Sequence, residues 1–150
     1  MEPTEDQLKP IEGGCLCGAV RYSAHAEPIT IRACWCRVCQ YFASGNSTIN
    51  VVFPKDAVTI TGELKDYEST ADSGNRMHRR FCPACGTQMF SESEARPHLI
   101  IARAGTLDDP EIAKASGVIW TKSAPSWAYI DPDVQHFEGQ PPAPAPAKPA

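Results

Sequence analysis

The sequence has no apolar run of the roughly 20 residues that would be needed to cross a membrane. It also has no secretory signal, because residues 1–10 are acidic and lack the apolar segment of a signal peptide. Basic charge is scarce, with 14 Lys and Arg against 18 Asp and Glu and a net charge of −4. Nucleic-acid-binding proteins usually carry a basic surface. We therefore expect a cytoplasmic protein that binds neither membranes nor nucleic acid.

Helical periodicity is nearly absent. Short runs rich in Val, Ile, Thr and Tyr recur between Gly, Pro and Asp residues, and Val20 and Tyr22 alternate with polar neighbours as in a half-buried strand. Only residues 36–43 and 108–112 suggest short helical turns. The pattern predicts an all-β fold with strands at 19–24, 29–33, 48–53, 57–61, 65–69, 76–81, 88–91 and 98–104.

No cysteine stands far from the others. The seven cysteines form the clusters Cys15-Leu-Cys17, Cys34-Trp-Cys36-Arg-Val-Cys39 and Cys82-Pro-Ala-Cys85. An odd count without an export signal argues against a disulfide framework. The last cluster has the form of a redox pair, but such pairs open a helix, whereas a glycine and a strand-like run follow here. Clustered thiolates suit a metal, and thiolate-only ligation favours zinc over iron.

Seven thiols divide naturally into four and three. Four thiolates close a structural zinc site, whereas three leave one coordination position open for chemistry. The pairs at 15–17 and 82–85 are similar knuckles, and each is followed by a glycine, Gly18 or Gly86, that permits a turn with positive φ. Two such knuckles held by one metal would close a β-sheet domain.

Read with their neighbours, the three clusters resemble the glutathione-dependent formaldehyde-activating enzyme family, which includes the centromere protein V-like domains. The resemblance covers roughly residues 12–138 and implies a single β-tent domain, similar to the Mss4-like zinc fold, with zinc knuckles. It also implies a structural zinc on Cys15, Cys17, Cys82 and Cys85 and a catalytic zinc on Cys34, Cys36 and Cys39. The segments that carry it are Gly14–Tyr22, Cys34–Cys39 and Phe81–Thr87, supported by Ala104–Pro110 and Ser123–Trp127.

The predicted domain is bounded by two segments of different composition. Residues 1–10 form an N-terminal extension, and residues 11–139 form the zinc-binding domain of this family. Residues 140–150 are rich in proline and alanine, and we expect them to be a disordered tail that cannot pack.

The resemblance implies a carbon–sulfur lyase similar to S-(hydroxymethyl)glutathione synthase. Such an enzyme adds glutathione, or a similar thiol, to a small aldehyde or cleaves the adduct. A zinc ion with one free position suits this reaction, because it can accept a thiol as thiolate and can polarise a carbonyl oxygen. The alternative is a non-enzymatic zinc module that binds a protein or nucleic acid. The three-cysteine cluster argues for the enzyme, because a binding module needs no open metal position.

The basic side chains nearest the clusters are candidates for contacts with the carboxylates of the thiol. Arg37 lies inside the middle cluster, and Arg79 belongs to the basic run 76–80. An arginine presents a two-pronged donor to a carboxylate, but most surface charges are simply solvated, which favours the exposed face of a strand for this run. His78 in the same run could be a ligand or a proton carrier, but a lone histidine is more often structural.

Aromatic residues lie within the middle cluster and just after it. Tyr41 and Phe42 stand where the family commonly carries a basic residue and small residues, and they either pack in the core or narrow the aldehyde side of the site. Trp35, between two of the cysteines, either packs beneath the metal loop or lines the mouth of the site, and its size favours packing.

Overall fold

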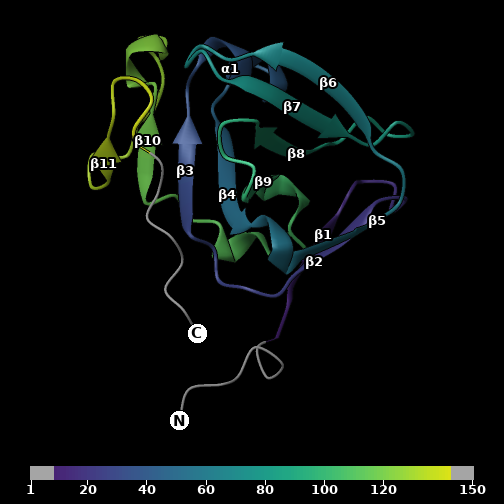
Figure 1. Ribbon diagram of the computed structural model, residues 1–150. Helices are drawn as coiled ribbons and strands as arrows, with labels where there is room; N and C mark the ends of the chain where they lie inside the picture. Colours follow the sequence, from purple (N-terminus) through teal and green to yellow (C-terminus); the bar gives the residue numbers. More distant parts are fainter. Residues whose placement is uncertain (1–8, 143–150) are drawn as a thin grey trace.

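The computed structural model describes residues 9–142, which form two β-sheets and one short helix. The smaller sheet has three antiparallel strands in the order β1 (Ile11–Gly14), β2 (Arg21–Ala24) and β5 (Val58–Thr61). Figure 1 shows this sheet in purple and blue at the lower right, where it faces one end of a larger, curved sheet.

The larger sheet has eight strands in the order β11-β10-β3-β4-β9-β8-β7-β6. Its pairs are antiparallel except where β10 lies parallel to β3 and β11 lies parallel to β10. The strands are β3 (Thr30–Cys34), β4 (Thr48–Pro54), β6 (Lys65–Thr70), β7 (Arg76–Phe81), β8 (Gln88–Ser93), β9 (Leu99–Arg103), β10 (Gly117–Ile119) and β11 (Gln135–His136).

Helical structure is confined to short turns. The α-helix α1 (Arg37–Phe42) follows β3 directly, as the sequence predicts. Short 3₁₀ turns occupy η2 (Lys55–Ala57), η3 (Ala104–Thr106), η4 (Pro110–Ile112) and η5 (Thr121–Ser123). The all-β prediction is confirmed, and each of the eight predicted strands is present with its ends within two residues of the prediction.

The hydrophobic core lies between the two sheets. Tyr22 packs edge-on against Phe90 with ring centroids 5.0 Å apart, and its hydroxyl lies 2.7 Å from Oγ1 of Thr106. Gly13 of β1 lies so close to Tyr22 and Thr106 that a Cβ atom there would overlap both residues. This close approach requires glycine in β1, which weakens the strand signal and explains why the sequence pattern does not predict β1.

Strand β4 separates the core from the candidate site. Side chains alternate between the two faces of a strand, so Val51 and Phe53, both 0% exposed, point into the core. Asn50 and Val52 point to the opposite face, which carries the cavity described below. The strand that anchors the core therefore also forms the floor of the site.

The segments predicted to flank the domain fall mostly outside the described residues. The extension 1–10 contributes only Lys9 and Pro10, and the tail 140–150 contributes only Gln140, Pro141 and Pro142. Gln140 accepts a hydrogen bond from Nε1 of Trp120 at 3.1 Å. Within residues 9–142, no helix is long and apolar enough to span a membrane.

Candidate metal centres

The first cysteine group, here called the four-cysteine site, consists of Cys15, Cys17, Cys82 and Cys85. Their sulfur atoms all lie within 4.8 Å of one another. The Sγ atoms of Cys15 and Cys17 are 3.6 Å apart, and those of Cys17 and Cys82 are 3.8 Å apart. A tetrahedral zinc ion with Zn–S bonds of about 2.3 Å requires sulfurs about 3.8 Å apart. The donor set and its spacing therefore fit one zinc ion.

The two knuckles that carry these cysteines share one backbone turn. In each, the glycine after the second cysteine donates its N–H to the carbonyl of the first: Gly18 to Cys15 at 3.1 Å and Gly86 to Cys82 at 2.8 Å. Both glycines have positive φ, +83° and +79°, which other residues adopt only at a cost. The sequence similarity of the knuckles therefore reflects a common geometry.

Hydrogen bonds stabilise thiolates in the four-cysteine site. The N–H of Val20 donates to Sγ of Cys15 at 3.3 Å and lowers the pKa of that thiol. The Thr87 hydroxyl and backbone lower the pKa of Cys85 to about 5. Thiolates are the form that binds metal, so these contacts favour the ligating state.

The second group, here called the three-cysteine site, consists of Cys34, Cys36 and Cys39. Cys34 is the last residue of β3, Cys36 caps α1, and Cys39 lies in the first turn of that helix. The three sulfurs lie within 4.8 Å of one another and each residue is only 5–6% exposed. Among residues 9–142, no fourth His, Cys, Asp or Glu side chain joins this group. The arrangement matches a metal site with one open position.

The loop that carries the three cysteines is fixed by buried polar contacts. The N–H of Cys39 donates to Sγ of Cys36 at 3.3 Å, so the thiol acts as the helix N-cap. The side-chain amide of Gln40 donates to the carbonyls of Trp35 at 2.8 Å and Ser123 at 3.1 Å. These contacts hold the sulfurs on the side of the loop that faces the sheet.

Without a metal, the three thiols differ in how readily they lose a proton. Hydrogen bonds from Cys34 and Cys36, together with the charge of Arg103, lower the pKa of Cys39 to about 2. Hydrogen bonding with Cys36 and Cys39, followed by burial, raises the pKa of Cys34. Three buried thiolates so close together need a cation among them, and a divalent metal fits this donor set.

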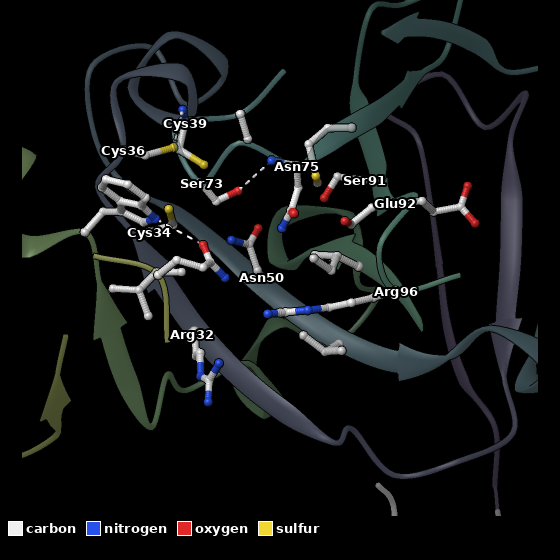
Figure 2. Close-up of a pocket in the computed structure, with 18 of the residues that line it drawn as sticks. Arg32, Cys34, Cys36, Cys39, Asn50, Ser73, Asn75, Ser91, Glu92 and Arg96 are labelled. Carbon is white, nitrogen blue, oxygen red and sulfur yellow. Dashed lines mark hydrogen bonds between the residues drawn. The ribbon is translucent and has the colours of Figure 1, made fainter. Parts of the chain in front are cut away.

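A cavity opens beside the three-cysteine site on the face of the large sheet that points away from the core. Figure 2 shows Cys34, Cys36 and Cys39 at one end of it, Arg32 and Arg96 toward the other, and Asn50 between. The turn that joins β6 to β7 contributes Ser73 and other residues to the wall. The three cysteines therefore share a cavity with arginine, asparagine and serine side chains.

Two buried arginines line this cavity. Arg79 is 3% exposed, and its Nη1 donates to Oγ of Ser69 at 2.6 Å. Arg103 is 9% exposed, and its Nη1 donates to Oδ1 of Asn50. Within the described part of the chain, neither forms an ion pair, and the Nε of each is buried without a hydrogen-bond partner. The cavity thus holds buried positive charge with unused donors.

Two further arginines stand at the far end of the cavity. Arg96 donates to the carbonyl of Pro141 at 3.5 Å, and Arg32 lies over the ring of Phe137 at 5.6 Å. Burial, and then the charge of Arg96, lower the pKa of Arg32. Neither arginine has a carboxylate partner among residues 9–142, so two like charges face a common space.

The residues predicted to contact substrate lie in different environments. Arg79 lines the cavity, and its guanidinium lies 5.4 Å from the ring centre of Phe42. Arg37 is exposed on α1, where it contacts Gln40 at 2.5 Å and lies 5.3 Å from the ring of Tyr41. Tyr41 is 77% exposed. Arg37, Tyr41 and Phe42 are not among the residues that line the cavity.

His78 lies away from both cysteine groups. It alternates with Arg79 along β7 and therefore points to the opposite face of the sheet. Its Nδ1 lies 2.7 Å from a carboxylate oxygen of Asp66 on the neighbouring strand. This pairing agrees with the structural interpretation of a lone histidine. Trp35 is 2% exposed and packs against Trp127, which agrees with a packing role for that ring.

Comparison with known proteins places this geometry in a family. The family profile described as glutathione-dependent formaldehyde-activating enzyme matches residues 10–123. The chain belongs to this family. A protein of Halomonas elongata that carries the family's name on a provisional basis is 26% identical over 139 residues, 87% of this chain and 88% of its own length. A crystal structure of a Rhodobacter sphaeroides protein matches with a TM-score of 0.55 at 19% identity, covering 70% of this chain and 97% of that one.

Family membership confirms the predicted fold class. The described residues form two sheets with one short helix and two cysteine groups, as expected of the family's Mss4-like β-tent. Both cysteine groups have donor sets that can hold a metal ion such as zinc.

The sequence patterns did not identify four polar residues of the cavity: Arg32, Asn50, Arg96 and Arg103. Two of them leave a recognisable signal. Asn50 interrupts the apolar run of β4, and Arg103 follows four apolar residues at the end of β9. A polar residue within an apolar strand is costly to bury and therefore marks a position worth examining.

Proposed function

We propose that the chain is a zinc-dependent carbon–sulfur lyase that adds a thiol, glutathione or a similar molecule, to a small aldehyde or cleaves the adduct. In the forward direction a C–S bond forms and the thiol proton passes to the carbonyl oxygen, and in the reverse direction both changes are undone. The observation that carries this proposal is the group of three buried thiols at the end of an arginine-lined cavity, with no fourth protein ligand among residues 9–142.

The two cysteine groups have different roles in this proposal. Cys15, Cys17, Cys82 and Cys85 hold a structural zinc, which links two knuckles far apart in the sequence. Cys34, Cys36 and Cys39 hold a catalytic zinc. When bound there, zinc supplies a Lewis acid and a position at which a thiol is stabilised as thiolate.

The arginines at the far end of the cavity suit the carboxylates of the thiol. Arg32 and Arg96 present guanidinium groups that lack acidic partners among residues 9–142. Glutathione carries two carboxylates, and bidentate Arg–carboxylate pairs give both attraction and orientation. A tripeptide held there would have its sulfur directed along the cavity toward the cysteines.

Of the four residues predicted to contact substrate, Arg79 is best placed to do so. It lines the cavity with a free Nε donor, and the Phe42 ring holds its guanidinium in position. Arg37 and Tyr41 remain predicted contacts for the part of a thiol that projects beyond the cavity. All seven thiols are free, so we also propose a reducing compartment such as the cytoplasm.

The test is direct measurement of adduct formation. Zinc-loaded protein is mixed with glutathione and formaldehyde, and the adduct is followed by NMR against the uncatalysed rate and against the Cys36→Ser variant. We expect acceleration by the zinc-loaded protein and none by the variant. Acceleration with another thiol alone would retain the lyase and discard glutathione. No acceleration with any thiol–aldehyde pair would overturn the proposal and favour a zinc-binding interaction module.

A further inference from the structure

We propose that Arg103 is a built-in counter-charge for the three-cysteine site, positioned there by Asn50. Its guanidinium offsets the negative charge that three thiolates leave on a divalent metal. This inference rests on the proposed metal at Cys34, Cys36 and Cys39, but not on the identity of the reaction.

Strand register brings Arg103 to the cysteines. In the large sheet, Cys34 of β3 pairs with Thr48 of β4, and Asn50 of β4 pairs with Arg103 of β9. Residues 48 and 50 lie on the same face of β4. Arg103 and the three cysteines accordingly line the same cavity. Nη1 of Arg103 donates to Oδ1 of Asn50, which limits the directions that the guanidinium can take.

The charge of Arg103 has no other partner. Among residues 9–142 it forms no ion pair, although Glu92, another lining residue, is buried and pairs with Lys55 and Arg80. Burial lowers the pKa of Arg103, whereas negative charge on Cys39, and then on Cys34 and Cys36, raises it. A buried charge without a partner is costly, so the thiolates themselves are the groups that stabilise Arg103.

Arg103 offsets the net charge of the three-cysteine site when a metal is bound. Three thiolates carry −3 and a divalent metal carries +2, so the occupied site has a net charge of about −1. One guanidinium brings the sum to about zero, so the site needs no other buried cation. Arg79 does not take this role as directly, because its Nη1 is bound to Ser69 and its guanidinium lies over Phe42.

Loss of Arg103 should lower metal affinity at the three-cysteine site alone. Without Arg103, binding a metal would create a buried negative charge at the three-cysteine site, and metal affinity there would fall. The four-cysteine site lies elsewhere and includes the exposed Cys17, so its affinity would not change. Arg37 provides the matched comparison. It is nearer in sequence, between Cys36 and Cys39, but it is exposed on the outer side of α1, where solvent screens its charge.

The experiment measures metal retention in the zinc-loaded protein. A zinc chelator is titrated into four proteins: wild type, Arg103→Met, Arg103→Lys and Arg37→Met. Zinc per chain is measured for the weaker site, which we expect to be the three-cysteine site, and for the tighter site, which we expect to be the four-cysteine site. Circular dichroism reports the fold of each variant. We expect Arg103→Met to weaken the weaker site at least tenfold and to leave the tighter site unchanged. Arg103→Lys, which keeps the charge, should fall by a smaller factor, and Arg37→Met should match wild type.

Unchanged affinity in Arg103→Met would overturn the counter-charge, as would equal losses in Arg103→Met and Arg103→Lys. If Arg103→Met does not fold, Arg103→Lys and Asn50→Leu decide. The inference then requires Arg103→Lys to lower the zinc affinity of the three-cysteine site less than tenfold. It also requires Asn50→Leu to weaken that affinity, because the guanidinium loses its support. Zinc content and adduct formation of the wild type distinguish failure of the proposed function from failure of this inference. A wild type that retains two zinc ions but catalyses no adduct formation leaves this inference standing, whereas a wild type that binds one zinc ion overturns both.

Discussion

The backbone N–H of Leu16 donates a hydrogen bond of 3.2 Å to the hydroxyl of Thr87, across the two knuckles of the four-cysteine site. The same hydroxyl lies 3.1 Å from Sγ of Cys85. Thr87 is therefore both a link between the knuckles and a partner of a metal ligand. Partners of this kind orient ligands and commonly affect metal affinity when they are removed.

Replacement of Thr87 by valine should weaken the four-cysteine site by about 10- to 100-fold, as is typical for loss of a partner of a metal ligand. It should also lower the thermal unfolding temperature, because structural zinc binding contributes to folding free energy. Chelator titration combined with thermal unfolding measures both. Thr59→Val, on the exposed face of β5, is the control. Equal behaviour of the two variants would contradict the role of Thr87.

The two cysteine groups should respond oppositely to loss of one thiol. Cys82→Ser should unfold or aggregate the protein, because the four-cysteine site holds together segments 65 residues apart. Cys36→Ser should keep the fold, bind one zinc ion in place of two, and lose lyase activity. Metal analysis and circular dichroism on the purified variants provide the measurement. A well-folded Cys82→Ser protein with an unchanged unfolding temperature would show that the structural assignment is wrong.

Arg96, at the far end of the cavity, should contribute to the binding of thiols that carry a carboxylate. Arg96→Met should raise the KM for glutathione about tenfold or more, since a hydrogen bond to a charged group contributes roughly 1.5–3 kcal/mol. The KM for 2-mercaptoethanol, which has no carboxylate, should stay near the wild-type value. Steady-state kinetics with both thiols make the comparison. A similar rise for both thiols would indicate a general disturbance of the cavity.

His78 should give the stability a small pH dependence. The carboxylate of Asp66, and more weakly those of Glu68 and Glu94, raise the pKa of His78 in the folded protein. A raised pKa contributes stability that is fully present below the unfolded value of about 6.5 and is lost as pH rises through the folded value.

Urea unfolding of wild type and His78→Gln at pH 6 and pH 9 tests this dependence. The advantage of wild type over the variant should be larger at pH 6. An advantage that is equal at the two pH values, or larger at pH 9, would show that the ion pair contributes no such dependence.

The features that the sequence predicts best are those encoded by residues close together in the chain. Each cysteine cluster lies within a few residues, so spacing alone indicates metal binding, and strands such as 76–81 carry their own β signal. The short strands β10 and β11 lack that signal because they contain only three and two residues. They are defined by the pairing of β10 with β3 and of β11 with β10.

The cavity could not be predicted because it depends on register across strands. Arg103 is far from the cysteines in sequence, and only the pairing of β3, β4 and β9 places it beside them. Arg37 is the reverse case. It lies between two of the cysteines, but successive helical residues turn by about 100°, so Cys36 and Cys39 face the sheet while Arg37 faces outward.

The parallel pairing of β10 with β3 has a consequence for synthesis on the ribosome. Chains emerge from the N-terminus, and early segments can fold before later ones exist. All ligands of the four-cysteine site have been made by residue 85, whereas the three-cysteine loop is supported by Arg103 and by the Ile119 carbonyl, which accepts from the N–H of Trp35 at 3.1 Å. If metals bind as proposed, a nascent chain can capture the first one before the segments that surround the second site have been made.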